Sequence, residues 1–232
     1  MNNYAQKQNF FLSQITDKSN DKKDFSGCDL SGIDLRGLDL SGINLMDADL
    51  QGANLAQANL AGANLDRANL MHASLREVNL SETFLCYANL VGTDLAYANL
   101  CNAVLKGAKL NQSNLWGASL CNVDLSEADL RDAQLIEASL IEAKLIESNL
   151  SNAKLCGAIL MEANLNQANL TGADLTWANL MEANLIDANV TEVNLANAKL
   201  LGTIMPDGVI DYRAFYSSEI NHLCVHANQF ID

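Results

Sequence analysis

Proline, aromatic residues and long apolar runs are scarce in this sequence of 232 residues. Pro206 is the only proline, and aromatic residues make up 6% of the chain. No run approaches the ~18 consecutive apolar residues of a membrane helix, and the polar N-terminal residues lack the apolar centre of a signal peptide. The sequence therefore predicts no association with a membrane, and we expect the protein to be cytoplasmic.

Cationic residues are few as well. The chain has 14 Lys and Arg against 28 Asp and Glu, which gives a formal net charge of −14. Contacts to phosphate groups need clustered cations, so we expect no direct binding of nucleic acid. An acidic rod would instead suit a basic groove, which is the physical basis of DNA mimicry.

Motifs for catalysis and for metal binding are also missing. The six cysteines show no CxxC or other metal-ligand spacing. His222 and His226 lie four residues apart, but no third ligand is identifiable by spacing, so a surface or capping role is favoured. No nucleophile stands beside a base, and no phosphate-binding loop occurs. We expect a protein that is not an enzyme, with no metal and no cofactor.

What the sequence has is a repeat of five residues. From Leu30 to Leu200 every fifth residue is leucine, except Val190, and Phe25 extends the register by one step. Leucines five apart would spiral around an α-helix, and they would alternate between the two faces of a flat strand. A chain that turns by a fixed angle every five residues can instead direct each leucine to one axis. The repeat therefore predicts a β-solenoid.

A second position of the repeat supports an interior of this kind. Two residues before each leucine, from Ala48 to Ala198, 24 of 31 positions are alanine. One large and one small inward side chain per repeat can fill a narrow tube. The core leucines of this tube are expected to include Leu65, Leu85, Leu105, Leu125, Leu145 and Leu165. Asn and Asp dominate just before the leucine, where turn conformations are needed.

Tandem A(D/N)LXX units, such as Ala-Asn-Leu-Ala-Gln at 53–57 and Ala-Asp-Leu-Thr-Trp at 173–177, resemble the pentapeptide-repeat proteins of the cyanobacterial type. The resemblance implies an all-β fold, a right-handed quadrilateral parallel β-helix with four repeats per coil. Thirty-six repeats would then form about nine coils, roughly 43 Å long at ~4.8 Å per coil. For most such proteins the family supplies no activity.

The two ends lie outside the repeat and predict caps. Residues 1–24 are expected to form an N-terminal capping helix and linker, with packing favoured over membrane attachment, and residues 25–204 the β-helix. Ile33, Leu38 and Ile43 stand where later coils have small residues, as if the first coil widens to receive an aromatic cap. Residues 205–232 predict a turn at Pro206 followed by a helix for capping or homodimerisation.

One surface column is unusually apolar when the repeats are assigned to four faces. It includes Ile141, Met161 and Met181, with Ile159 beside it, and the next column is a ladder of carboxylates. We predict a protein-interaction face formed by Ile141, Glu142, Ile159, Met161, Glu162, Met181 and Glu182. The alternative is that residues just after the leucine are half-buried at corners and merely tolerate apolar side chains.

Two weaker surface features accompany this face. Aromatic and aliphatic side chains gather in two further groups, Phe84, Tyr87 and Val104 in one and Tyr97, Trp116, Ile136 and Trp177 in the other. Cys101 and Cys121 lie twenty residues apart and should meet on adjacent coils, where they would be close enough to pair if oxidised. Two reduced neighbours are the favoured interpretation, because disulfides are rare in the cytosol.

These observations favour a non-enzymatic scaffold that binds an unidentified protein along one face. The resemblance also implies an alternative, an acidic DNA mimic that inhibits DNA gyrase, as in quinolone-resistance members of the family. Those members tend to have phenylalanine at the centre of the repeat and, in several cases, protruding loops, whereas the centre here is almost always leucine and the register has no insertion. A secreted bacterial effector is a third hypothesis.

Overall fold

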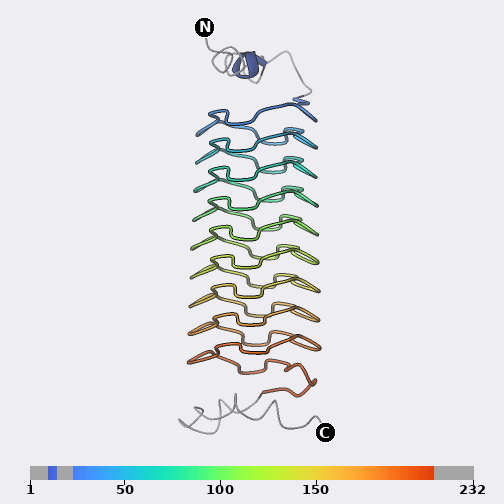
Figure 1. Cartoon of the computed structure of the whole chain (residues 1–232), viewed down its shortest axis with the longest axis vertical. Helices are drawn as coiled ribbons and strands as arrows, with labels where there is room; N and C mark the ends of the chain where they lie inside the picture. Colours follow the sequence, from blue (N-terminus) through green and yellow to red (C-terminus); the bar gives the residue numbers. More distant parts are fainter. Residues whose placement is uncertain (1–9, 15–22, 212–232) are drawn as a thin grey trace.

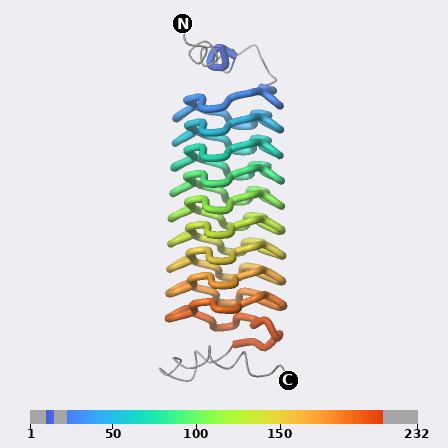
Figure 2. Tube along the Cα trace, in the orientation of Figure 1, coloured from blue at the N-terminus to red at the C-terminus, as the bar shows by residue number. Residues whose placement is uncertain are grey.

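The computed structural model describes residues 10–14 and 23–211. Residues 10–14 are helical, and residues 23–211 form a straight rod of stacked coils (Figure 1). Residue j pairs with residue j+20 through parallel β-bridges all along the rod, and nine consecutive bridges lead from Asp24 to Ile204. The tube trace shows the same path repeated from one coil to the next (Figure 2). Each coil is therefore twenty residues long, or four repeats.

The bridges do not extend into strands. Within the described residues, each repeat contributes one bridged residue, the one just before the leucine, and no continuous sheet forms. The physical reason is the turn that follows every leucine. The second residue after the leucine has a positive φ, for example 61° at Glu127 and 63° at Trp177, which no extended strand can contain. The expectation of a parallel β-helix is thus refined to a ladder of single bridges.

Hydrogen bonds explain why five residues suffice for one repeat. The leucine and the second turn residue donate N–H to the next coil, the bridged residue donates to the preceding coil, and the small inward residue donates back to the leucine of its own turn. The first turn residue donates to the Asn or Asp side chain two residues earlier. In the repeat Leu125 to Asp129 the acceptors, in order, are the Lys144 carbonyl, Asp124 Oδ1 and the carbonyls of Ile146, Leu125 and Ala108.

The core is a single column of leucine and small residues. The six leucines predicted as core, Leu65, Leu85, Leu105, Leu125, Leu145 and Leu165, are at most 1% exposed. The small inward residues are equally buried, and where threonine or serine replaces alanine the hydroxyl usually bonds a carbonyl, as Thr83 Oγ1 does with Leu60 at 3.0 Å. These leucines and small residues form the core of the rod.

The N-terminal end of this column is covered by an aromatic residue. Phe11, in the helical segment 10–14, is 2% exposed, and its ring lies 4.4 Å from the ring of Phe25. Ile33 and Ile43 are buried and Leu38 is half-buried in the first coils. The larger residues of the first coil thus accompany an aromatic cover by Phe11.

The C-terminal end is closed by a reversal of the chain. Met205 N–H donates to the Val209 carbonyl at 2.8 Å, and Ile204 pairs antiparallel with Ile210. Gly202 N–H, which in other coils would donate to a following coil, donates to the Asp211 carbonyl at 2.8 Å. The ladder of parallel bridges thus ends at Ile204, two residues before Pro206. The predicted capping and dimerisation helix lies outside the described residues, apart from its first residues up to Asp211.

Candidate protein-interaction face

The structure stacks the predicted site residues on three adjacent coils. Ser139 pairs with Ile159, and Ile159 pairs with Asn179. Glu142 N–H donates to the Met161 carbonyl at 2.9 Å, and Glu162 N–H donates to the Met181 carbonyl at 3.0 Å. We call the outward surface over Leu140, Leu160 and Leu180 the acidic face. It comprises residues 139, 141, 142, 159, 161, 162, 179, 181 and 182.

The side chains of the acidic face differ in exposure. Glu142, Glu162 and Glu182 are exposed, whereas Ile141, Met161 and Met181 are half-buried at the corner. Ile159 occupies a bridge position and is 36% exposed. The half-burial of the corner column agrees with the alternative that such positions tolerate apolar residues. Ile159 is the exception, because nearly all bridge positions of the rod carry polar side chains.

Charge sets this side of the rod apart from the others. The positions that face outward here hold no Lys or Arg between Asp39 and Lys199, whereas each of the other three sides carries cations over the same length. Five ion pairs are found among the described residues, and none involves a glutamate of the acidic face. Its carboxylates therefore stand in a column without neutralising partners.

The acidic face also lacks a hydrogen bond found in most repeats. With Ser139 and Ile159 in place of Asn or Asp, the N–H groups of Ile141 and Met161 have no acceptor among the described residues, and the same holds for Cys121 after Ser119. The coils on either side are normal, since Asn99 Oδ1 accepts from Cys101 and Asn179 Oδ1 accepts from Met181. On the other three sides at most two consecutive coils lack this bond.

A second feature of the rod concerns bulky side chains at the positive-φ position. The Tyr97 ring leans over Gly117 of the following coil, where a Cβ would lie 2.8 Å from the ring, and Tyr87 leans over Gly107 in the same way. Trp177 occupies the same position but is followed one coil later by Asn197. It is 64% exposed, the highest value for an aromatic residue in 23–211. Trp177 precedes Asn179, the bridge partner of Ile159, by two residues.

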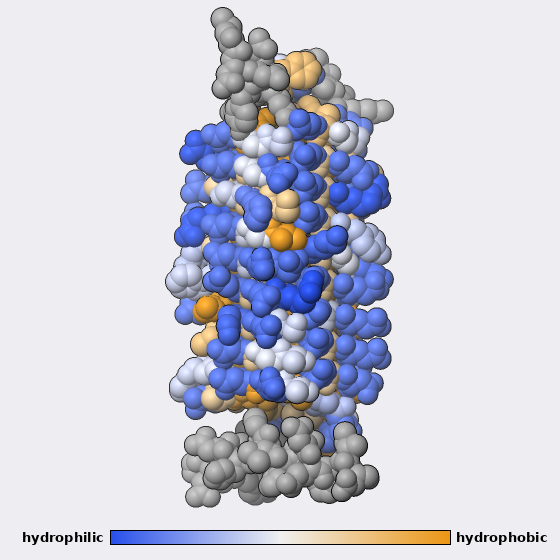
Figure 3. All heavy atoms as spheres, viewed as in Figure 1, coloured by the Kyte–Doolittle hydropathy of each residue, from blue (hydrophilic) through white to orange (hydrophobic). Residues whose placement is uncertain are grey.

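The remaining aromatic side chains are largely held by neighbours. Arg76 lies 5.0 Å from the Tyr97 ring centre, and the Tyr97 and Trp116 rings are 6.2 Å apart. Phe84 and Val104 are bridge partners on adjacent coils, with Phe84 50% exposed. The space-filling view shows a mainly hydrophilic surface with small, separate hydrophobic spots on the side drawn (Figure 3).

Cys101 and Cys121 are neighbours on adjacent coils, as predicted, since Asn102 N–H donates to the Cys121 carbonyl. Both are free thiols. Burial raises the pKa of the Cys101 thiol, and this outweighs the backbone hydrogen bond from Cys121, which lowers it. The Cys121 Sγ lies 3.3 Å from Ser139 Oγ. A raised thiol pKa disfavours the reactive thiolate.

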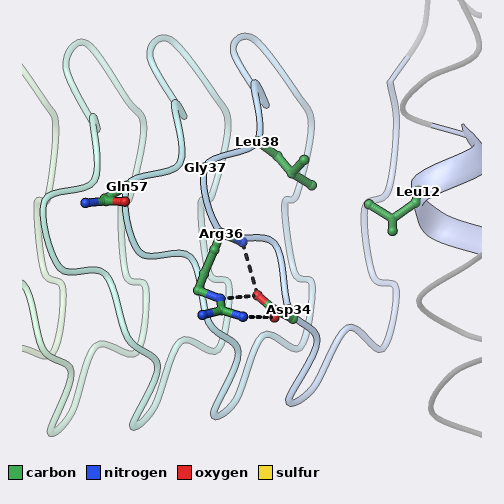
Figure 4. Close-up of a pocket in the computed structure, with 6 residues that line it drawn as sticks. All are labelled: Leu12, Asp34, Arg36, Gly37, Leu38 and Gln57. Atoms are coloured by element: carbon green, nitrogen blue, oxygen red, sulfur yellow. Dashed lines mark hydrogen bonds and ion pairs between the residues drawn. The ribbon is translucent and has the colours of Figure 1, made fainter.

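A hollow of about 480 Å³ lies at the opposite end of the rod, between the helical segment and the first coils (Figure 4). Leu12 and Leu38 form its apolar part, and Arg36 pairs with Asp34 at 2.7 Å beside it. The hydrogen bond from Arg36 lowers the pKa of Asp34. Among the described residues that line the hollow, Arg36 is the only cation, and it is already paired with Asp34.

No metal-binding arrangement is found in the part of the chain that the structure describes. Among residues 10–14 and 23–211, no three His, Cys, Asp or Glu side chains are grouped to hold a metal ion. No described helix has the length and apolar character to cross a bilayer. His222 and His226 lie outside the described residues.

Two features of the site were missed by sequence reasoning. The column of glutamates was recognised, but the missing acceptors at Ser119, Ser139 and Ile159 were not, although the departure from Asn or Asp is visible in the sequence. The protrusion of Trp177 was also missed. Its signal is the residue twenty positions later, Asn197 in place of glycine, which is meaningful only once the direction of the side chain is known.

Comparison with known proteins gives one family. The model of Pentapeptide repeats (8 copies) matches residues 24–60, 53–86, 88–126, 124–160 and 158–197. A search of curated proteins finds no match.

Several solved structures are similar. HetL, a pentapeptide repeat protein involved in heterocyst differentiation regulation from the cyanobacterium Nostoc sp. strain PCC 7120, is 35% identical over 83% of this chain and 95% of its own, with a TM-score of 0.37. Rfr23 from the cyanobacterium Cyanothece 51142 is 23% identical over 89% and 98%, with a TM-score of 0.27. QnrB1, a plasmid-mediated fluoroquinolone resistance protein, is 18% identical over 76% and 92%, with a TM-score of 0.40.

Proposed function

The chain belongs to the pentapeptide-repeat family, and from this premise we propose that it is a non-enzymatic scaffold whose acidic face binds another protein. The fold proposed with it is a right-handed quadrilateral β-helix of about nine coils. The rod is filled with leucine and alanine, so it has no interior cavity in which a substrate could be enclosed. Recognition must therefore use the outside of the coils.

The observation that carries the proposal is the column of Glu142, Glu162 and Glu182 without ion-pair partners. Like charges about 4.8 Å apart on neighbouring coils repel one another, and the five ion pairs on other sides show that the rod can place cations beside acids. Folding gains nothing from this arrangement. A partner that neutralises the column supplies the missing interaction, and the adjoining apolar side chains add burial at roughly 25 cal/mol per Å².

Capture of partners from a lysate of the source organism tests this proposal. Immobilised wild-type protein is compared with Met161→Glu and with the double variant Glu162→Gln, Glu182→Gln. Thr171→Glu is the matched control, because Thr171 is a half-buried first turn residue like Met161 but lies on the opposite side of the coil. We expect the control to retrieve the same proteins as wild type and both face variants to lose a common subset. Identical sets from all four proteins would refute the site.

The alternative, a DNA mimic that inhibits gyrase, has weaker physical support. Residues 25–204 carry 21 Asp and Glu and 9 Lys and Arg, a net charge of −12. Over roughly 43 Å this gives about one charge per 3.6 Å, whereas duplex DNA carries about one per 1.7 Å. The uninterrupted coils between residues 24 and 204 also leave no protruding loop. A supercoiling assay with purified gyrase separates the two functions, because only the mimic is expected to inhibit.

A further inference from the structure

We propose, on the premise of the function above, that the partner presents an amphipathic α-helix that lies along the rod axis on the acidic face. One edge of this helix carries Lys or Arg against Glu142, Glu162 and Glu182. The neighbouring stripe is apolar and packs against Ile159, Met161 and Trp177. Spacing, charge and exposed apolar surface each support this occupant, and the unused hydrogen-bond donors indicate which polar side chains it carries.

The spacing of the coils matches a helix better than a strand. Equivalent residues on successive coils are about 4.8 Å apart, so three glutamates span roughly 9.6 Å. Side chains on one face of an α-helix recur every 3.6 residues, or about 5.4 Å, and seven residues cover roughly 10.5 Å. Side chains on one face of an extended strand recur about every 6.7 Å and fall out of register within two coils. Three cations of a parallel helix can therefore each meet one glutamate.

The charge of the face excludes other kinds of partner. A second copy of this chain would bring a chain of net charge −14 against the three unpaired carboxylates, and nucleic acid would bring phosphates. Both are repelled at the short distances of an interface. A cationic partner is attracted before contact, because unscreened charges of opposite sign speed association at low salt. The column without Lys or Arg thus selects a basic surface.

Trp177 offers a large exposed apolar side chain, which the column of glutamates lacks. Unlike Tyr97, which covers Gly117, Trp177 has no glycine to cover and remains 64% exposed beside the column that contains Ile159. Exposed tryptophan next to a small apolar patch is typical of residues that dominate binding energy. The apolar stripe of an amphipathic helix fits between this ring and the corner at Met161.

The free N–H groups of Ile141 and Met161 give the face hydrogen-bond donors as well. In most other repeats the preceding Asn or Asp accepts from the equivalent N–H, and here these donors stay available to the side-chain oxygen of a partner. A helix satisfies its own backbone carbonyls, so Gln, Asn or Ser side chains along its contact edge are the groups expected to accept.

Binding of model peptides tests the proposal without knowledge of the natural partner. The probe is a peptide of about eighteen residues, equal in Lys and Leu, ordered with a helical period of 3.6, and roughly 27 Å long as a helix. Its matched control has the same composition in strict alternation, which favours a strand. The protein carries Trp116→Phe, so that Trp177 is its only tryptophan. Tryptophan emission then reports binding at the acidic face.

We expect the helical peptide to shift the Trp177 emission and to bind at least tenfold more tightly than the alternating peptide. The triple variant Glu142→Gln, Glu162→Gln, Glu182→Gln should weaken helix binding about tenfold or more. Glu127→Gln, Glu147→Gln, Asp187→Asn, which removes three charges from the next corner, should weaken it less than about twofold. Circular dichroism confirms that both triple variants are folded.

Three outcomes would overturn the helix proposal. These are equal affinity for the two peptides, equal weakening by the two triple variants, and binding without a change in Trp177 emission. The peptide result is independent of lysate capture. If the face variants lose natural partners but the helical peptide has no advantage, the face is correct and the partner class is wrong. If capture is unchanged as well, the proposed function also fails.

Discussion

The acidic face and the face opposite it belong to the same coils but differ in their ion pairs and in their side-chain hydrogen bonds. Over Leu130, Leu150 and Leu170, Arg131 pairs with Asp129 at 2.7 Å, and Asn149 and Asn169 bond to each other and to the turns that follow them. The acidic face has neither ion pairs nor a full set of these bonds. Both faces rest on the same buried leucine and alanine. The packing of the core therefore does not depend on which residues occupy the outward positions. Departures from the repeat on one face then indicate a role other than folding.

The largest effect is expected from a substitution in the leucine core, which supports both faces. Leu125→Asp places a carboxylate in the closed core, where Leu125 is 1% exposed. Loss of the leucine alone costs about 2–5 kcal/mol, and an unpaired buried charge adds to this cost. We expect loss of the β signal in circular dichroism. Ser126→Asp, one residue away and outward, is the control and should stay folded. A folded Leu125→Asp protein would contradict the closed core.

A smaller effect is expected where an aromatic residue covers a glycine. Gly117→Ala puts a Cβ 2.8 Å from the Tyr97 ring at a φ of 61°, whereas Gly62→Ala at a φ of 65° meets nothing within 4 Å. The left-handed conformation costs about 1–2 kcal/mol in either variant. Denaturant titration should show a larger loss for Gly117→Ala, and adding Tyr97→Ala should remove the excess. Equal losses would mean that the ring is not held there.

The hydrogen bond from the first turn residue to the preceding Asn or Asp side chain should contribute about 1 kcal/mol to the free energy of unfolding. Asn149 Oδ1 accepts from Ser151 N–H at 3.1 Å and from its hydroxyl at 2.8 Å, so Asn149→Ala should lower the free energy of unfolding by about this amount. Gln134→Ala is the control, because Gln134 occupies the same position without bonding the turn. Similar losses in the two variants would show that the bond adds no stability.

Acid should weaken the sides that carry paired or bonded aspartates. A hydrogen bond from Arg131 lowers the pKa of Asp129, and one from Thr176 lowers the pKa of Asp174. A depressed folded pKa gives stability that is present above the unfolded value, near 3.9, and is lost as the pH falls through the folded pKa. Unfolding free energies between about pH 5 and pH 2 should therefore fall less in Asp129→Asn than in wild type, by under about 1 kcal/mol.

The core could be predicted because it depends on the period of the repeat alone. The five-residue spacing of Leu125 and its equivalents fixes which side chains turn inward, and the family resemblance supplied four repeats per coil. For the surface, the sequence predicted only which residues stack in columns on successive coils. Whether Trp177 protrudes depends on which way a side chain at a positive φ leans. Whether the N–H of Ile141 finds an acceptor depends on where the Ser139 hydroxyl points, and it lies against Cys121 Sγ. Neither direction is encoded in a period.

The most direct test of the acidic face measures both the free energy of unfolding and the binding of partners for the variant Ile159→Asn. Asparagine at this bridge position should accept the Met161 N–H, as Asn179 does for Met181 at 3.3 Å, and raise the free energy of unfolding by about 0.5–1 kcal/mol. It also removes the exposed apolar side chain of the acidic face. We predict a more stable protein that captures partners, and the helical peptide, less well. A variant that gains stability and binds as wild type does would contradict the claim that this face departs from the repeat in order to bind.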